Sequence, residues 1–154
     1  IVTAAHCFHG FFYARANRRL RAGTTYRNIG GSLTYIIREF NHPSYGTLGY
    51  EGDITVVLLA TPLDLSPVVQ QGAIVSQGFV MPDNIPVIHA GWGDTTQGGF
   101  PSPILQEVEI YTINNQLCTE RYNDLNPSRY IVTENMICVG VLDVGGRDAC
   151  QGDS

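Results

Sequence analysis

The sequence predicts an all-β fold, a sandwich or barrel of short strands, and three observations support it. Stretches of strand length that are rich in β-branched and aromatic residues recur along the chain. Glycine and proline, with 17 and 8 copies, divide the sequence at turns. Only one short segment has the features of a helix, and a length of 154 residues fits one domain by itself.

Four segments are predicted to be strands, and turn residues bound them. Residues 32–40 (SLTYIIREF) lead into a turn, and residues 54–60 form a continuous apolar run of strand length. Residues 86–91 are a third candidate. Residues 104–113 are the fourth, and there apolar residues alternate with glutamates and a tyrosine, as on a strand with one buried face.

The remaining segments connect these strands. A short helix is predicted over residues 115–122, with Asn114 as its N-cap. Residues 62–86 are irregular and rich in turn residues. A cluster of arginines at positions 15, 18, 19 and 21 is typical of a solvated loop or an edge strand.

Composition excludes some classes of protein and restricts others. The net charge of −5 argues against a nucleic-acid-binding surface, and no apolar stretch reaches the roughly 18 residues of a membrane span. The chain has nine arginines and no lysine. A guanidinium group stays charged beyond pH 12, whereas a lysine loses its charge near pH 10.4, so this composition suits an alkaline fluid.

Three motifs carry the chemistry. His6 lies in the sequence Thr-Ala-Ala-His-Cys, Asp53 precedes an apolar run, and the chain ends in the sequence Asp-Ala-Cys-Gln-Gly-Asp-Ser at Ser154. A serine hydroxyl is a weak nucleophile that needs a histidine base, and an aspartate fixes the tautomer of that histidine. The alternatives are a buried structural histidine and an aspartate that caps a turn. His9, His42 and His89 lack such a context and are interpreted as structural.

These motifs, together with Ala-Gly-Trp-Gly at residues 90–93, resemble the chymotrypsin-like serine peptidases of the trypsin branch along the whole chain. The resemblance implies two six-stranded antiparallel β-barrels. Residues 1–74 are expected to be a partial first barrel with the inter-barrel connection, and residues 75–154 a partial second barrel. Both ends cut through motifs, so we expect an incomplete chain that is inactive alone.

The resemblance also implies a role for each site residue. His6, Asp53 and Ser154 correspond to the catalytic triad, and the backbone N–H groups of Gly152 and Ser154 correspond to the oxyanion hole. Asp148 corresponds to the floor of the primary specificity pocket, which implies cleavage after arginine or lysine.

Two neighbouring positions refine this assignment. Ala149 replaces the serine that is commoner in trypsins, so we expect a preference for arginine, which binds a carboxylate bidentately. Asp153 corresponds to the partner of the ammonium group released on zymogen activation. Because Ile1 belongs to the strand that enters the histidine motif, we expect Asp153 to be unpaired here.

The four cysteines fit no close-paired zinc pattern. Their even number alone is compatible with two internal disulfides. The resemblance instead implies one disulfide, between Cys118 and Cys138, with the partners of Cys7 and Cys150 outside the chain. Disulfides imply secretion.

The expected function is that of a secreted trypsin-like serine endopeptidase, similar to the digestive midgut trypsins of lepidopteran larvae. Its partners are expected to be protein or peptide substrates with arginine or lysine before the scissile bond, and protein inhibitors, with the enzyme a monomer. No cofactor is implied, and no calcium site is expected because residues 22–37 contain no carboxylate. The alternatives are an inactive homologue that serves as a binding module, and a cascade protease of clotting or immunity.

Overall fold

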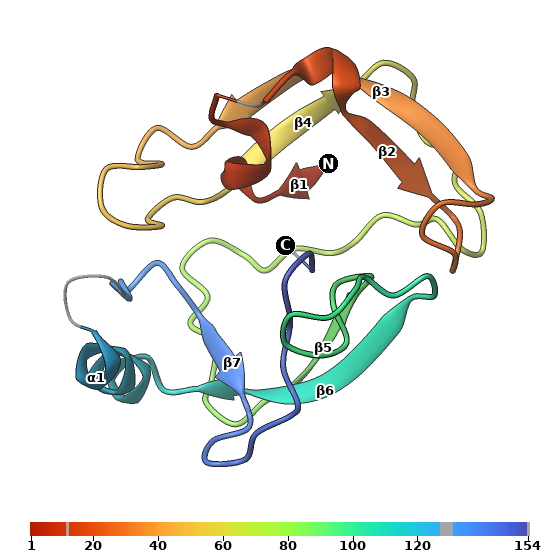
Figure 1. The fold of residues 1–154 in the computed structure, drawn as a ribbon. Coiled ribbons are helices and arrows are strands. Elements are labelled where there is room, and N and C mark those ends of the chain that lie inside the picture. Colours follow the sequence, from red (N-terminus) through yellow and green to blue (C-terminus); the bar gives the residue numbers. More distant parts are fainter. Residues whose placement is uncertain (12, 127–130, 154) are drawn as a thin grey trace.

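The computed structural model describes residues 1–11, 13–126 and 131–153. In these ranges the strands form two antiparallel sheets, one of four strands and one of three, which face each other with the long 62–85 connection running between them (Figure 1). The predicted all-β class is confirmed. No helix within the described ranges is long and apolar enough to cross a membrane.

The first sheet has the strand order β1-β4-β3-β2. Its strands are β1 (Val2–Thr3), β2 (Arg19–Ala22), β3 (Ser32–Asn41) and β4 (Thr55–Leu59). Two short 3₁₀ helices, η1 (Ala5–Phe8) and η2 (Arg15–Asn17), connect β1 to β2. The predicted strands over residues 32–40 and 54–60 are therefore present, and the arginine-rich segment forms a strand at one end of this sheet.

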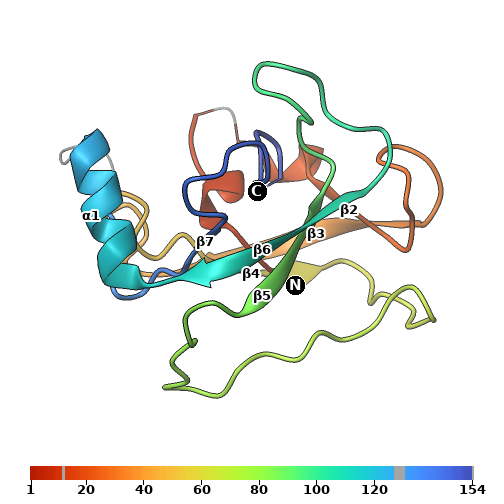
Figure 2. The same ribbon diagram turned by 90° about the horizontal axis from the view of Figure 1, so that it is seen from below.

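The second sheet has the order β5-β6-β7, with β5 (Pro86–Gly91), β6 (Gln106–Ile113) and β7 (Cys138–Gly140). The helix α1 (Asn115–Leu125) follows β6 and lies at one side of the sheet (Figure 2). The Asn114 side chain accepts a hydrogen bond from the Leu117 N–H, which confirms the predicted N-cap. The short strand β7 was not predicted.

Alternation of buried and exposed residues sets the orientation of the strands. In β6, Ile110 is fully buried and Thr112 nearly so, whereas the intervening glutamates and tyrosine are exposed, as the sequence predicted. In β4, Thr55 and Val57 are buried. Val56, between them, is half-exposed, so one face of the first sheet is well covered and the other is open.

Two sets of hydrogen bonds join the two sheets. Near one end, the Trp92 Nε1–H donates to the Thr25 carbonyl at 2.9 Å, and backbone bonds link residues 25–27 to residues 103–105. Near the other end, Glu51 accepts hydrogen bonds from Thr133 and Asn135. These contacts fix the sheets relative to each other on both sides of the candidate site.

Candidate active site

The register of the first sheet brings His6 next to Asp53. Thr3 of β1 pairs with Thr55 of β4, so η1, which follows β1, lies beside the residues that precede β4. Ala5 is fully buried within η1. A larger side chain at that position has no room, so the small residues before His6 let the helix pack closely against β4.

Both oxygens of the Asp53 carboxylate bind His6. The His6 backbone N–H donates to Oδ1 at 2.8 Å, and the ring Nδ1 lies 2.7 Å from Oδ2. A carboxylate accepts hydrogen bonds, so Nδ1 carries the ring proton and Nε2 presents a lone pair. Nε2 makes no hydrogen bond among the described residues. The Asp53 side chain is 19% exposed and that of His6 is 36% exposed, so a held and partly accessible imidazole can act as a general base.

The Cys7 thiol, next to His6 in the sequence, has a raised pKa. Burial raises the pKa of the Cys7 thiol, and the negative charge of Asp53 raises it further, against a smaller opposing effect of Arg18. Cys7 is a free cysteine here. The environment of the Cys7 thiol therefore favours its neutral form.

The segment that leads to Ser154 is held by backbone groups. The Asp153 carboxylate accepts hydrogen bonds from the Gly93 N–H at 2.7 Å and from the Cys150 N–H at 2.9 Å. The Gln151 carbonyl accepts from the Asp94 N–H at 2.9 Å. Asp153 is half-buried, and these two amide groups, which are neutral donors and not a cation, compensate part of its charge.

Gly93 is required for this arrangement. A Cβ atom at residue 93 would lie 2.6 Å from the Asp153 carboxyl carbon, so the carboxylate would have to move from this position. From the sequence, the glycines of residues 90–93 were expected to let strands pack closely around Trp92. The structure adds that they make room for the Asp153 carboxylate, and that Trp92 bonds across to the first sheet.

The remaining predicted residues lie in the same segment. Gly152 has a φ of 96°, which lies in the left-handed region that favours glycine. Asp148 is exposed, and its carboxylate accepts a hydrogen bond from the Ala149 N–H at 2.7 Å. Ser154, the predicted nucleophile, lies outside the described residues.

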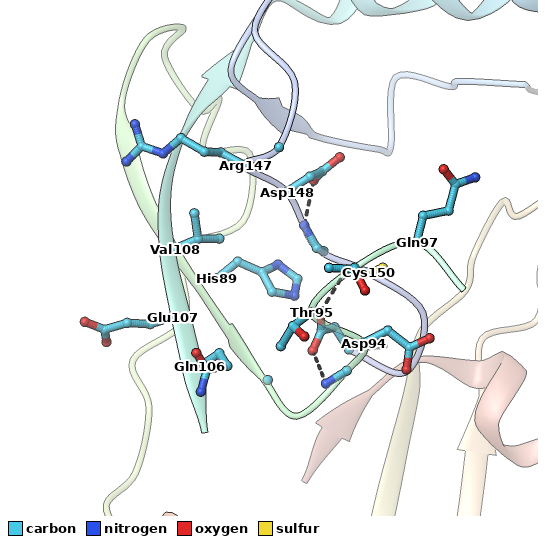
Figure 3. A pocket seen from close by; sticks show the side chains of 16 residues that line it. His89, Asp94, Thr95, Gln97, Gln106, Glu107, Val108, Arg147, Asp148 and Cys150 are labelled. Atoms are coloured by element: carbon cyan, nitrogen blue, oxygen red, sulfur yellow. Dashed lines mark hydrogen bonds between the residues drawn. The ribbon is translucent and has the colours of Figure 1, made fainter. Parts of the chain in front are cut away.

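A cavity of about 390 Å³ adjoins this segment (Figure 3). The final segment supplies Asp148, Ala149, Cys150 and Asp153 to its wall, and strands β5 and β6 supply the opposite side. Sequence reasoning missed the involvement of His89, whose ring points into the cavity from β5 (Figure 3). The alternation of β5 places His89 on the same face as Val87 and Gly91, but the sequence does not show that a cavity adjoins this face.

The comparisons with known proteins decide the family. The trypsin family matches the chain over residues 1–154, its entire length. The chain belongs to the trypsin family. Alkaline trypsin B of Manduca sexta is 41% identical to it over 155 residues, which cover 100% of this chain and 58% of that protein. Achelase-1 of Lonomia achelous is 39% identical over 158 residues, covering 100% of this chain and 72% of that protein.

The fold agrees with this family assignment. The crystal structure of the scabies mite inactivated protease paralogue S-D1 superposes with a TM-score of 0.81 at 19% identity, covering 90% of this chain and 59% of that one. The predicted chymotrypsin-like fold is therefore confirmed, in partial form. The chain spans about 58% of the length of alkaline trypsin B and of several other relatives from moths and beetles.

The disulfide implied by the trypsin-family resemblance is present. Cys118 of α1 is bonded to Cys138 of β7, with the Cα atoms 6.4 Å apart. Cys7 and Cys150 are free cysteines in the described part of the chain. No group of three or more histidine, cysteine or carboxylate side chains suited to a metal ion occurs among the described residues.

Proposed function

We propose that this member of the trypsin family is part of a serine endopeptidase in which His6, Asp53 and Ser154 form the catalytic triad. The observation that carries the proposal is the His6–Asp53 pair, in which both carboxylate oxygens bind the histidine and Nε2 stays free. A base held in this tautomer is what a serine nucleophile requires.

The reaction follows from these groups. The Ser154 hydroxyl attacks the carbonyl carbon of the scissile peptide bond while its proton passes to His6 Nε2. The negative oxygen that forms is stabilised by the N–H groups of Gly152 and Ser154, and the left-handed Gly152 supports this role. The amine then leaves with the proton from Nε2, and water hydrolyses the acyl-enzyme by the same steps in reverse order.

We further propose that Asp148 selects arginine or lysine before the scissile bond, with a preference for arginine because residue 149 is alanine. We also propose that Asp153, beside the cavity, pairs with the ammonium group formed on activation. Residues 1–74 belong to the first barrel and residues 75–154 to the second barrel in this proposal. A secreted digestive role in an alkaline fluid is supported by the absence of lysine and by the alkaline trypsins A and B of Manduca sexta among the relatives of the chain.

The test uses the complete gene product after activation. It is expected to hydrolyse short peptidyl amides that end in arginine faster than those that end in lysine, measured as kcat/KM, with little activity on other residues. The Ser154→Ala variant should lose roughly 10⁶-fold in kcat, and Asp148→Ser roughly 10⁴-fold in kcat/KM on arginine substrates. Equal kcat/KM for arginine and lysine contradicts the specificity proposal, whereas no turnover by the activated wild type favours an inactive binding homologue.

A further inference from the structure

Charge is strongly segregated along this chain. Residues 1–41 contain six of the nine arginines and one of the 14 carboxylates, whereas residues 42–154 contain three arginines and 13 carboxylates. The first segment therefore has the opposite sign to the net charge of −5. The proposed function uses none of these six arginines, which are Arg15, Arg18, Arg19, Arg21, Arg27 and Arg38.

The single carboxylate of that segment neutralises only one arginine. Glu39 binds Arg15 bidentately, with distances of 2.7 Å to Nε and 2.8 Å to Nη2. Among the described residues, no carboxylate lies within ion-pair distance of the other five guanidinium groups. Arg19 is exposed, whereas Arg21 is half-buried and its Nη1 donates a hydrogen bond to the Gly30 carbonyl. A guanidinium group has five N–H donors, so both arginines keep donors for an external anion.

Two of these arginines share a face with apolar side chains. Arg19 and Arg21 are alternate residues of β2, so they point to the same side, and they pair with Tyr35 and Leu33 of β3. Thr34, between these two residues, is buried and points to the other side. Tyr35 is 56% exposed and Leu33 is 46% exposed. We call Arg19, Arg21, Leu33 and Tyr35 the arginine face.

The geometry of this face fits one kind of ligand. Alternate residues of a strand are about 7 Å apart, which is also the spacing of alternate side chains in an extended peptide. Guanidinium groups bind carboxylates in a planar, two-point manner. Leu33 and Tyr35 offer apolar area beside these charges, which an acidic polypeptide with apolar side chains can cover and a sulfated polysaccharide cannot.

We propose that the arginine face binds an extended acidic segment of a protein partner, with carboxylates on Arg19 and Arg21 and apolar side chains on Leu33 and Tyr35. The face is distinct from the residues assigned to catalysis and specificity. Binding of this kind adds affinity for acidic proteins and leaves the cleavage of short peptides unchanged. The binding does not depend on the proposed function, since it needs no turnover.

The experiment measures binding with the complete gene product carrying Ser154→Ala, so that no ligand is cleaved. The probe is a fluorescein-labelled random copolymer of glutamate and tyrosine in a 4:1 ratio, followed by fluorescence anisotropy at low and at physiological salt. We expect salt-sensitive binding, a loss of about tenfold in affinity for the double variant R19Q/R21Q, and a smaller loss for Y35S.

Arg121→Gln is the control for R19Q alone, because it removes one arginine whose guanidinium is already paired with Asp143 at 3.2 Å. We expect R121Q to bind the copolymer like the parent protein. An equal loss in R121Q and R19Q overturns the proposal, because it indicates a diffuse charge effect. Tighter binding of heparin with the same dependence on Arg19 and Arg21, or no binding of the copolymer at low salt, also overturns it. A catalytically inactive wild type leaves this measurement unaffected, so failure of the two proposals can be told apart.

Discussion

The two parts of the candidate active site are held in different ways. His6 and Asp53 flank two paired strands of one sheet, and two direct hydrogen bonds join them. The segment 148–153 follows β7 with no strand of its own, and its place depends on a few bonds between Asp153, Gln151 and the backbone of residues 93–94. The first part is built into the sheet, whereas the second depends on local contacts that a single added atom can disturb.

Among the variants that test this comparison, the largest effect is expected from a change in the first part that leaves its shape intact. In the activated complete gene product, Asp53→Asn should lower kcat by about 10⁴, the size known for this change in the serine-protease template. The amide can donate to the histidine Nδ1, which then loses its proton and favours the wrong tautomer. Steady-state hydrolysis of an arginine amide measures the loss.

The control measurement for Asp53→Asn is the affinity for an inhibitor that occupies the specificity pocket. Binding of a cationic inhibitor such as benzamidine should change less than threefold, because the 148–153 segment does not depend on Asp53. A loss of inhibitor binding comparable with the loss of kcat contradicts the separation of the two parts.

The second part should be disturbed by one methyl group. Gly93→Ala places a Cβ atom 2.6 Å from the Asp153 carboxyl carbon, so Asp153 must move and the adjacent Gly152 with it. Loss of one oxyanion donor lowers kcat by about 10²–10³, and we expect a loss in this range. The control is Gly72→Ala, since nothing lies within 4 Å of a Cβ atom at that residue. Similar kcat values for the two variants show that Asp153 has room to adapt.

The disulfide provides a third distinction between the two parts. It joins α1 to β7 and closes a loop with a sequence separation of 20 residues. The double variant C118A/C138A of the complete gene product, also carrying Ser154→Ala, should lose about 3 kcal/mol in the free energy of unfolding, measured in urea. Hydrogen exchange should increase in residues 141–153 and change little in β1 and β4. An equal increase in both sheets contradicts this distinction.

The sequence predicted the elements with strong local signals. Residues 86–91 were predicted with the same bounds as β5. The alternation in residues 104–113 predicted a strand that contains β6, and Asn114 was predicted as the N-cap of α1, because alternation and capping are properties of neighbouring residues. The three-residue strand β7 is too short to show a period. The Trp92–Thr25 bond joins residues 67 positions apart, and no local pattern encodes a contact of that kind.

The site shows the same limit. The family resemblance singled out His6 and Asp53, and the strand register explains why they meet. It did not indicate that Asp153 is held by two amides or that His89 faces a cavity, because these depend on how β5 and the final segment pack. The catalytic and specificity roles of these residues stay predictions.

The smallest effect is expected at Glu51, which links the two parts from a position two residues before Asp53. Hydrogen bonds from Thr133 and then Asn135 hold the pKa of its carboxyl group below the ordinary value of about 4.3 for glutamate. A lowered pKa in the folded state means that Glu51 stabilises the protein above about pH 4.3 and loses this contribution as the pH falls through the folded value. The stabilities of wild type and Glu51→Gln, measured by urea unfolding, should therefore differ at pH 6, and the difference should shrink as the pH falls below about 4.3.

Thr133, which donates a hydrogen bond to Glu51, provides the matching variant. Thr133→Val removes the hydroxyl donor, so it should reproduce the effect of Glu51→Gln at pH 6, and the double variant should lose no more than the larger single one. Glu134→Gln, which changes an exposed carboxylate of the same loop, is the control for the lost charge and should be neutral. Additive losses for Glu51→Gln and Thr133→Val indicate that the two side chains act separately, in which case their hydrogen bond does not help to join the two parts of the site.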